Sequence, residues 1–191
     1  IVAYIAAAGR IHLRVGQRIR RVNKIYVSPA KTNLFFGKQP PQVFAQGSAI
    51  GYYGYAGAAA DEESPLGGGF LASVCERWEE PSKLISSRGM RVALLRTGVV
   101  FDKKYGALPV LLKPYKFFAG GPVGSGGQYI SWIHIDDAVG AIAFILRQNT
   151  VSGAVNLVSP GAVTMNEFAA AAGKALKRPS FLRAPGAVIK L

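Results

Sequence analysis

The chain has 191 residues, half of them hydrophobic, and a formal net charge of +13. This length favours one buried core. The apolar segments are repeatedly broken by Gly, Pro and charged residues, so none forms the roughly 20-residue apolar run that a transmembrane helix needs, and we predict no transmembrane segment. Cys75 is the only cysteine, and His12 and His134 are the only histidines, which excludes an internal disulfide and disfavours a metal site.

Strand-like and helix-like segments alternate along the chain, which is typical of an α/β protein with a mainly parallel sheet. Strands are predicted over residues 2–8, 43–48 and 91–96, and helices over residues 14–26, 70–80 and after Asp137. A further helix should begin at Thr164, because Thr164 and Glu167 have the spacing of a capping box. We expect Asp136 or Asp137 to cap the helix that follows it.

The first predicted helix, over residues 14–26, lies in a basic part of the chain, since every charged residue among the first 60 is Lys or Arg. Its basic and apolar residues each recur at helical spacing: Arg14, Arg18 and Arg21 on one stripe, Val15, Ile19 and Val22 on the other. Such a flank attracts any polyanion, but no nucleic-acid-reading motif accompanies it, so we disfavour nucleic acid as the partner.

The predicted helix over residues 70–80 has an apolar face that includes Phe70, Leu71 and Cys75, and we expect Cys75 to be buried. Glu76 and Glu79 are predicted on its opposite, solvated side. A glycine-rich loop follows later, over residues 119–127, and is suited to a tight fold or to close approach by a ligand.

The run GGPVGSGGQYISWIHIDDAVGAI, residues 120–142, resembles the NAD(P)-binding epimerase-like group of atypical extended short-chain dehydrogenase/reductases. GSAIGYYG (47–54), DEESP (61–65), WEE (78–80), LRTGVVFD (95–102) and AVNLVSP (154–160) continue the resemblance in the family's order. The resemblance implies a Rossmann-like parallel sheet with helices on both faces and a small C-terminal substrate-side region.

For the domain organisation, the resemblance implies a single partial domain over residues 1–191. Its core would comprise roughly residues 1–110 and 150–160, and its substrate-side region roughly residues 111–149 and 161–191. The chain would begin near the family's fourth strand, so we expect the N-terminal βα unit that binds the cofactor's phosphates to be absent.

The resemblance also implies NADP or NAD as the cofactor. The residues that match the family's cofactor-lining positions are Ala7, Ala8, Gly9, Asn23, Ser48, Arg96, Thr97, Gly98 and Val99. On the substrate side, Gly124, Gln128, Trp132 and His134 match. His134 could face the cleft and titrate near neutrality, or be a structural residue with satisfied hydrogen bonds.

In such families a Ser polarises a carbonyl, and a Tyr assisted by Lys in Tyr-x-x-x-Lys transfers the proton. Ser48 matches the serine, although a serine at a strand end also commonly bonds nearby backbone. Where the Tyr and Lys are expected, the chain offers Phe70 with Val74 or Leu71 with Cys75, so the pair is missing. Tyr52 and Tyr53 are the nearest replacements, and their alternative role is to pack over the cleft. The catalytic role and the cleft-packing role both require the turn at 47–54 and the segment 131–137 to meet at one end of a single sheet.

These residues predict an NADP(H)-preferring oxidoreductase or epimerase-like protein that acts on an unidentified small-molecule substrate. The missing Tyr-x-x-x-Lys keeps an alternative open: a catalytically inactive nucleotide-binding or structural accessory subunit, with protein partners in a larger, perhaps organellar, assembly. The compartment stays open between the cytoplasm and an organellar interior, mitochondrial matrix or plastid stroma.

Overall fold

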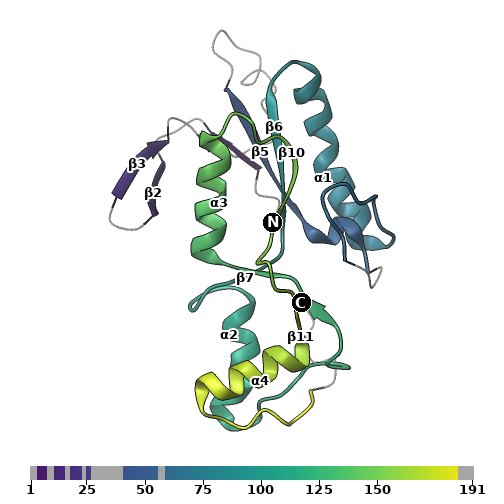
Figure 1. The fold of residues 1–191 in the computed structure, drawn as a ribbon, viewed down its shortest axis with the longest axis vertical. Coiled ribbons are helices and arrows are strands. Elements are labelled where there is room, and N and C mark those ends of the chain that lie inside the picture. Colours follow the sequence, from purple (N-terminus) through teal and green to yellow (C-terminus); the bar gives the residue numbers. More distant parts are fainter. Residues whose placement is uncertain are drawn as a thin grey trace. The chain divides into compact units, whose positions relative to one another are not determined.

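Figure 1 shows a computed structural model of the protein, which describes the backbone of the strands between residues 4 and 26 and all of residues 41–55 and 59–184. The chain forms two compact units. Unit 1 comprises Ile1–Thr97 and Asp136–Leu157, and unit 2 comprises Gly98–Ile135 and Val158–Leu191. The chain thus passes from unit 1 to unit 2 at residue 97, whereas we expected the substrate-side region to begin near residue 111.

Unit 1 is built on a five-stranded sheet with the order β10-β6-β5-β1-β4. Its centre is parallel: β5 (Val43–Ala49) pairs with β6 (Arg91–Thr97), and β6 pairs with β10 (Gly153–Leu157). This parallel centre confirms the predicted α/β class. The other edge departs from it, because β1 (Tyr4–Ala7) runs antiparallel to β5, and β4 (Ile25–Tyr26) runs antiparallel to β1.

Helices α1 (Phe70–Ser87) and α3 (Ile135–Arg147) flank this sheet on opposite sides, as predicted (Figure 1). Ile85 of α1 packs against Phe44 and Val92 of the two central strands in a buried cluster. Cys75 is buried, as predicted. The predicted burial of Phe70 and Leu71 and the predicted exposure of Glu79 are wrong, since Phe70 and Leu71 are exposed and Glu79 is buried.

The prediction of a helix over residues 14–26 is wrong, because this part of the chain forms a β-hairpin. Strand β2 (Ile11–Val15) pairs antiparallel with β3 (Arg18–Val22), with Ile11 opposite Val22 and Val15 opposite Arg18. The overlooked signal is the alternation of apolar and polar residues in IHLRV, followed by a glycine two residues before the next strand.

The described residues of unit 2 form two short sheets and two α-helices. Strand β7 (Val99–Phe101) pairs parallel with β9 (Trp132–His134), and β8 (Tyr129–Ile130) pairs antiparallel with β11 (Val163–Thr164). The helices are α2 (Ala107–Leu112), continued by the 3-10 turn η3 (Pro114–Phe117), and α4 (Met165–Leu176). Phe101, Ile130 and Met165 form the core of the unit.

The placement of β9 corrects one expectation about the site. The segment 131–137 does not extend the sheet that contains β5, because β9 pairs with β7 in a separate sheet of unit 2. The turn at 47–54 and this segment therefore do not share a sheet. Asp136 and Asp137 lie in the first turn of α3, where their negative charges favour the helix N-terminus.

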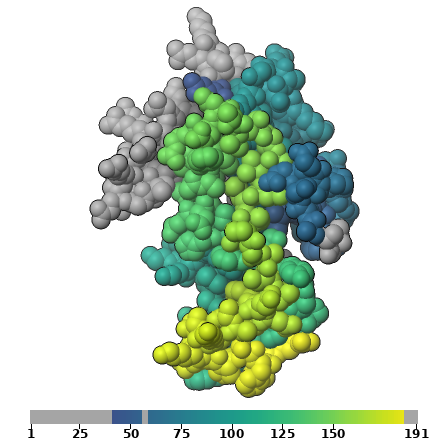
Figure 2. Space-filling view, viewed as in Figure 1, coloured from purple at the N-terminus to yellow at the C-terminus, as the bar shows by residue number. Residues whose placement is uncertain are grey.

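Helix α4 begins with the predicted capping box. The Thr164 hydroxyl accepts a hydrogen bond from the backbone amide of Glu167 at 3.2 Å, and the Glu167 carboxylate accepts one from the backbone amide of Thr164 at 2.7 Å. Hydrogen bonds from Thr164 lower the pKa of Glu167, the one from the backbone amide more than the one from the hydroxyl. Figure 2 shows the yellow residues of α4 and the stretch after it packed beside teal and green residues of unit 2.

We expect Thr164→Ala to lower the free energy of unfolding by about 1 kcal/mol, because it removes the N-cap acceptor. Because the pKa of Glu167 is lowered in the folded state, the box stabilises the protein above the ordinary Glu pKa, and this contribution is lost as the pH falls through the lowered value. Urea unfolding at neutral and acidic pH would measure both effects. Thr150→Ala, at an exposed turn, is the control, and an equal loss in both variants would contradict the prediction.

Candidate functional site

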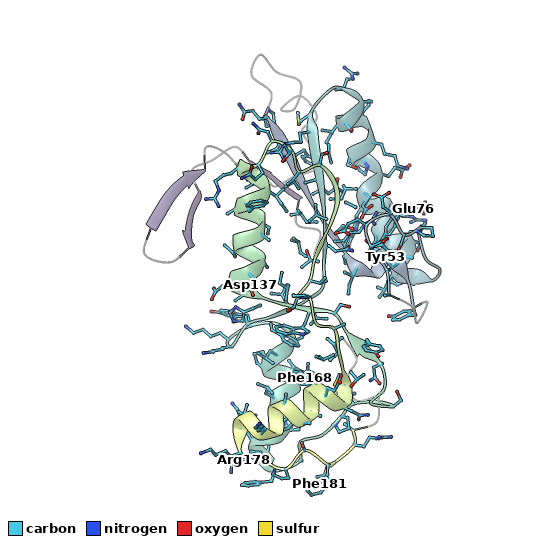
Figure 3. The ribbon with its side chains drawn as sticks, in the orientation of Figure 1. Tyr53, Glu76, Asp137, Phe168, Arg178 and Phe181 are labelled. Atoms are coloured by element: carbon cyan, nitrogen blue, oxygen red, sulfur yellow. The ribbon has the colours of Figure 1, made fainter. Side chains whose placement is uncertain are left out.

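The candidate site lies at the carboxyl ends of the parallel strands of unit 1, the edge where α/β proteins bind ligands. Ser48 of β5 stands opposite Arg96 of β6 in the strand register, and both side chains are buried. β5 leads directly into the 3-10 turn η2 (Ile50–Tyr53), which carries the two tyrosines. Figure 3 shows Tyr53 beside α1. The structure therefore brings all three predicted catalytic residues, Ser48, Tyr52 and Tyr53, to one place.

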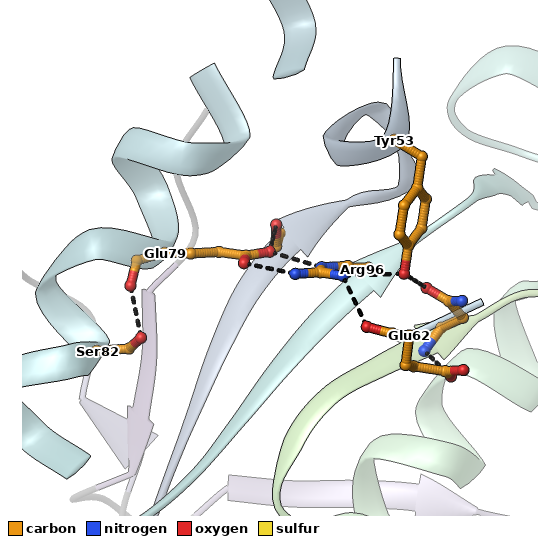
Figure 4. A network of polar contacts seen from close by, with 7 residues as sticks. Tyr53, Glu62, Glu79, Ser82 and Arg96 are labelled. Atoms are coloured by element: carbon orange, nitrogen blue, oxygen red, sulfur yellow. Dashed lines mark hydrogen bonds and ion pairs between the residues drawn. The ribbon is translucent and has the colours of Figure 1, made fainter. Parts of the chain in front are cut away.

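Arg96 is the centre of a buried network of polar contacts (Figure 4). Its guanidinium forms a two-pronged ion pair with Glu79 of α1, with Nε donating to Oε1 at 3.0 Å and Nη2 donating to Oε2 at 2.9 Å. Nη1 donates to the Tyr53 hydroxyl at 3.0 Å. That hydroxyl in turn donates to Oδ1 of Asn156 at 2.7 Å. The network thus joins β6, α1, η2 and β10.

Two further residues enclose the guanidinium. The Tyr52 ring lies against it, with its centroid 3.4 Å from Cζ of Arg96, which is a cation–π contact. The backbone oxygen of Glu62 accepts a long bond from Nη1 at 3.5 Å, while its side chain accepts one from the backbone amide of Asn156 at 2.7 Å. Burial by itself lowers the pKa of Arg96, but hydrogen bonding to Glu79 and Tyr53 outweighs it and raises this pKa above its ordinary value.

The hydroxyl of Ser48 is committed to this network. Its Oγ donates to Oε1 of Glu79 at 2.6 Å, inside the protein. A serine has one proton to donate, so in this arrangement Ser48 can accept a hydrogen bond from a ligand but cannot polarise a carbonyl. The same holds for Tyr53, whose hydroxyl already donates its hydrogen bond to Asn156. Catalysis by these hydroxyls stays a prediction, and it would require these internal bonds to change partners.

Glu79 is the residue that sequence analysis placed on the wrong side of its helix. It lies four residues after Cys75, so both belong to one face of α1, which also buries Ala72, Ser82 and Ile85. A second signal was present in β6, where Arg96 directly follows the apolar run 92–95, and a buried guanidinium needs an anion. The two signals together predict the ion pair.

The predicted cofactor-lining residues are only partly brought together. Ala7 ends β1, whose antiparallel register with β5 places Tyr4 opposite Gln46 and Ile5 opposite Ala45, so Ala7 lies toward the end of β5 remote from Ser48. Thr97 ends β6 next to Arg96, and its hydroxyl donates to the backbone oxygen of Leu95 at 3.2 Å. The predicted residues Ala8, Gly9 and Asn23 lie outside the described residues.

Gly98 and Val99 belong to unit 2, where they pack against the chain that precedes β9. A Cβ on Gly98 would come within 2.6 Å of the backbone oxygen of Ser131, so only glycine fits there. The backbone amide of Val99 donates to the same oxygen at 2.8 Å. These two residues have a clear structural role at the start of unit 2.

The predicted substrate-side residues all lie in unit 2. Gly124 has a positive φ of 65°, and Gln128 folds back so that its Nε2 donates to the backbone oxygen of Val123 at 2.6 Å. Trp132 donates to the backbone oxygen of Gly161 at 3.1 Å and stacks on Phe101. His134 ends β9, opposite Phe101. The polar groups of Gln128 and Trp132 therefore already have partners within the loop structure of unit 2.

Within the described residues, no three His, Cys, Asp or Glu side chains are grouped as a metal ion would need. The described helices also include none that is long and apolar enough to span a membrane.

Comparison with known proteins identifies the family, although no family model matches the chain. The chloroplastic SDR39U1 homolog of Arabidopsis thaliana, an epimerase family protein, is 39% identical over 180 residues, which cover 92% of this chain and 50% of the relative. The chain belongs to the epimerase-like group of atypical extended short-chain dehydrogenase/reductases. This confirms the family inferred from the sequence.

Two solved structures share the fold. The crystal structure of human epimerase family protein SDR39U1 (isoform 2) with NADPH is 35% identical, with a TM-score of 0.74 over 81% of this chain and 53% of that one. A nucleoside-diphosphate sugar epimerase from Corynebacterium glutamicum is 32% identical, with a TM-score of 0.63 over 81% of this chain and 34% of that one. The chain spans about half the length of the curated relatives it matches.

Proposed function

We propose that the whole protein is an NADP(H)-preferring oxidoreductase or epimerase-like protein of the short-chain dehydrogenase/reductase class, acting on a small-molecule substrate. The observation that supports this most is the likeness to the NADPH-bound human SDR39U1, which extends over four-fifths of the chain. The carboxyl edge of β5 and β6, with Ser48 and Thr97 at its strand ends, is the part of the chain that would face the cofactor.

The described residues offer little to hold the cofactor's phosphates. Glycines at the spacing of a phosphate-binding turn occur at 51, 54 and 57 and again at 121, 124 and 127. Neither set connects a strand directly to an α-helix. The first set begins within the 3-10 turn η2, and the second set is followed by strand β8. Arg96 cannot serve a phosphate either, since its charge is already paired with Glu79. The phosphates therefore do not fit the described residues, and we derive no reaction step through the cofactor.

The proposal is tested by heating the full-length protein with and without nucleotide. NADPH should raise the melting temperature, because a ligand at about 100 times its Kd stabilises the native state by about 2.7 kcal/mol. NADH, which lacks the 2′-phosphate, should give a smaller rise at the same concentration. Equal melting temperatures with NADPH, with NADH and without nucleotide would contradict the proposal.

A second candidate is a catalytically inactive nucleotide-binding or structural subunit of a larger assembly. The commitment of the Ser48 and Tyr53 hydroxyls to Glu79 and Asn156 favours it. The mass of the protein isolated under native conditions tests this candidate, which requires other subunits to co-purify. The name of the Arabidopsis relative includes the word chloroplastic, which favours an organellar interior for either candidate.

A further inference from the structure

Unit 2 exposes a group of large apolar side chains that the site does not use. Phe117 is the last residue of η3, and Phe118 follows it. Phe181 and Leu182 lie in the stretch after α4. Phe117 and Phe181 are 73% and 76% exposed, and Phe118 and Leu182 are about half exposed, at 56% and 47%. We call these four residues the aromatic edge. Exposed apolar groups of this size commonly mark an interaction surface.

The two parts of the aromatic edge are held together by bonds within unit 2. The backbone amide of Leu182 donates to the oxygen of Gly120 at 3.1 Å, which aligns the stretch after α4 with the stretch after η3. Arg178 lies over the Phe118 ring, with Cζ 4.2 Å from its centroid. Figure 3 shows Arg178 and Phe181 on the strip that follows α4. The two segments that carry the aromatic edge are therefore adjacent in unit 2.

Phe118 has a backbone conformation that a bulky residue rarely adopts. It directly follows η3, with a φ of 58° and a ψ of 17°, in the left-handed region that favours glycine. A bulky residue there costs conformational energy, and its ring is nevertheless half exposed instead of buried in the core. Folding and stability would be served better by glycine, so the ring at this position calls for another role.

The two segments that carry the aromatic edge are rich in basic residues and contain no acidic ones. Neither residues 103–135 nor residues 168–184 contain an Asp or Glu. The exposed basic residues in and beside the four apolar ones are Lys113, Lys116, Lys177, Arg178 and Arg183. A surface that combines bare phenyl rings with lysine and arginine, and lacks acids, is complementary to an anionic lipid surface, where rings enter the acyl boundary and cations meet the headgroups.

We propose that the aromatic edge docks this protein on the surface of a membrane that contains anionic phospholipids. Leu182 favours a lipid over a nucleic acid, because an aliphatic side chain gains from the acyl boundary but offers no ring on which a base can stack. This docking is peripheral, and it is independent of the proposed NADP(H) function.

The test is sedimentation of the full-length protein with vesicles of phosphatidylcholine, either pure or with about one quarter phosphatidylserine. The protein should bind the anionic vesicles and not the pure ones. Phe118→Gly should weaken binding about tenfold, by removing the apolar contribution of one ring, and should leave the melting temperature unchanged or raised, because glycine suits the positive φ. Lys116→Glu with Arg183→Glu should weaken it by at least about 25-fold, at about fivefold for each cation.

Matched controls use exposed residues of unit 1. Phe144→Ala on α3 removes a ring that is 50% exposed, and Arg77→Glu with Lys83→Glu on α1 changes the net charge by the same amount. Both should bind anionic vesicles like the unmodified protein. Losses as large as those of the aromatic-edge variants would overturn the proposal, as would binding to single-stranded RNA without binding to vesicles. A clear fall in melting temperature for Phe118→Gly would also overturn it, because the ring would then be covered by protein.

Discussion

Replacement of Glu79 by Leu is expected to lower the free energy of unfolding by about 3 to 5 kcal/mol. The Glu79 and Arg96 side chains are 8% and 6% exposed, so removing the carboxylate leaves a buried guanidinium without its anion. The Ser48 hydroxyl loses its acceptor in the same change. Urea unfolding followed by circular dichroism would measure the loss.

The matched control is Glu76→Leu, the same substitution three residues earlier on α1, where the side chain is exposed (Figure 3). It should change stability by no more than about 0.5 kcal/mol. Glu79→Leu combined with Arg96→Met should recover much of the loss, because replacing both charges leaves no uncompensated ion. If the double variant is less stable than Glu79→Leu alone, Arg96 contributes chiefly through Tyr52 and Tyr53, and the ion-pair explanation fails.

Replacement of Tyr115 by Ala should destabilise unit 2 by about 3 to 5 kcal/mol, the range for deleting a buried aromatic ring. Tyr115 is 1% exposed, and a Cβ on Gly120 would lie 2.3 Å from its Cδ1, so the ring is packed tightly against the backbone of the glycine-rich loop. Its hydroxyl donates a long bond of 3.3 Å to the backbone oxygen of Ala169 on α4. The ring thus connects η3, the loop and α4.

Two further variants separate the ring from the hydroxyl. Tyr115→Phe keeps the ring and should cost about 1 kcal/mol, the net value of one hydrogen bond. Tyr105→Ala, at a side chain that is 74% exposed, should have little effect. Thermal unfolding of the three proteins would order them, and a loss in Tyr115→Phe equal to that in Tyr115→Ala would show that the hydroxyl, not packing, dominates.

Local sequence signals predicted the centre of unit 1 well. The apolar runs of β5 and β6 bordered by polar residues and the start of α1 near Phe70 are each defined by neighbouring residues. The same is true of the capping box at Thr164 in unit 2. α1 nevertheless continues through Pro81 to Ser87, seven residues past the predicted end. Pro81 lacks an amide donor but does not end the helix, because the buried side chains of Ser82 and Ile85 make continuation favourable.

The errors arose where a pattern had two interpretations or where the decisive partner was distant. The basic residues of 11–22 fit a helical stripe as well as a hairpin, and pairing between β2 and β3 decides between them. Trp132–His134 form the strand β9, but the partner of β9 is β7, not a strand of the central sheet. The commitment of Ser48 to Glu79 depends on a residue 31 positions away, which no local pattern reports.

The polar network around Arg96 has a consequence for the order of events during synthesis on the ribosome. Glu79 and Arg96 are 17 residues apart and can pair early. Asn156, which accepts the hydrogen bond from the Tyr53 hydroxyl, follows Tyr53 by 103 residues. A nascent chain must therefore wait for β10 to leave the exit tunnel before the Tyr53 hydroxyl gains its acceptor. Until then the Tyr53 hydroxyl lacks the Asn156 acceptor and β6 lacks its neighbouring strand β10. The pairing of β10 with β6 is therefore the step that completes both the polar network and this side of the sheet.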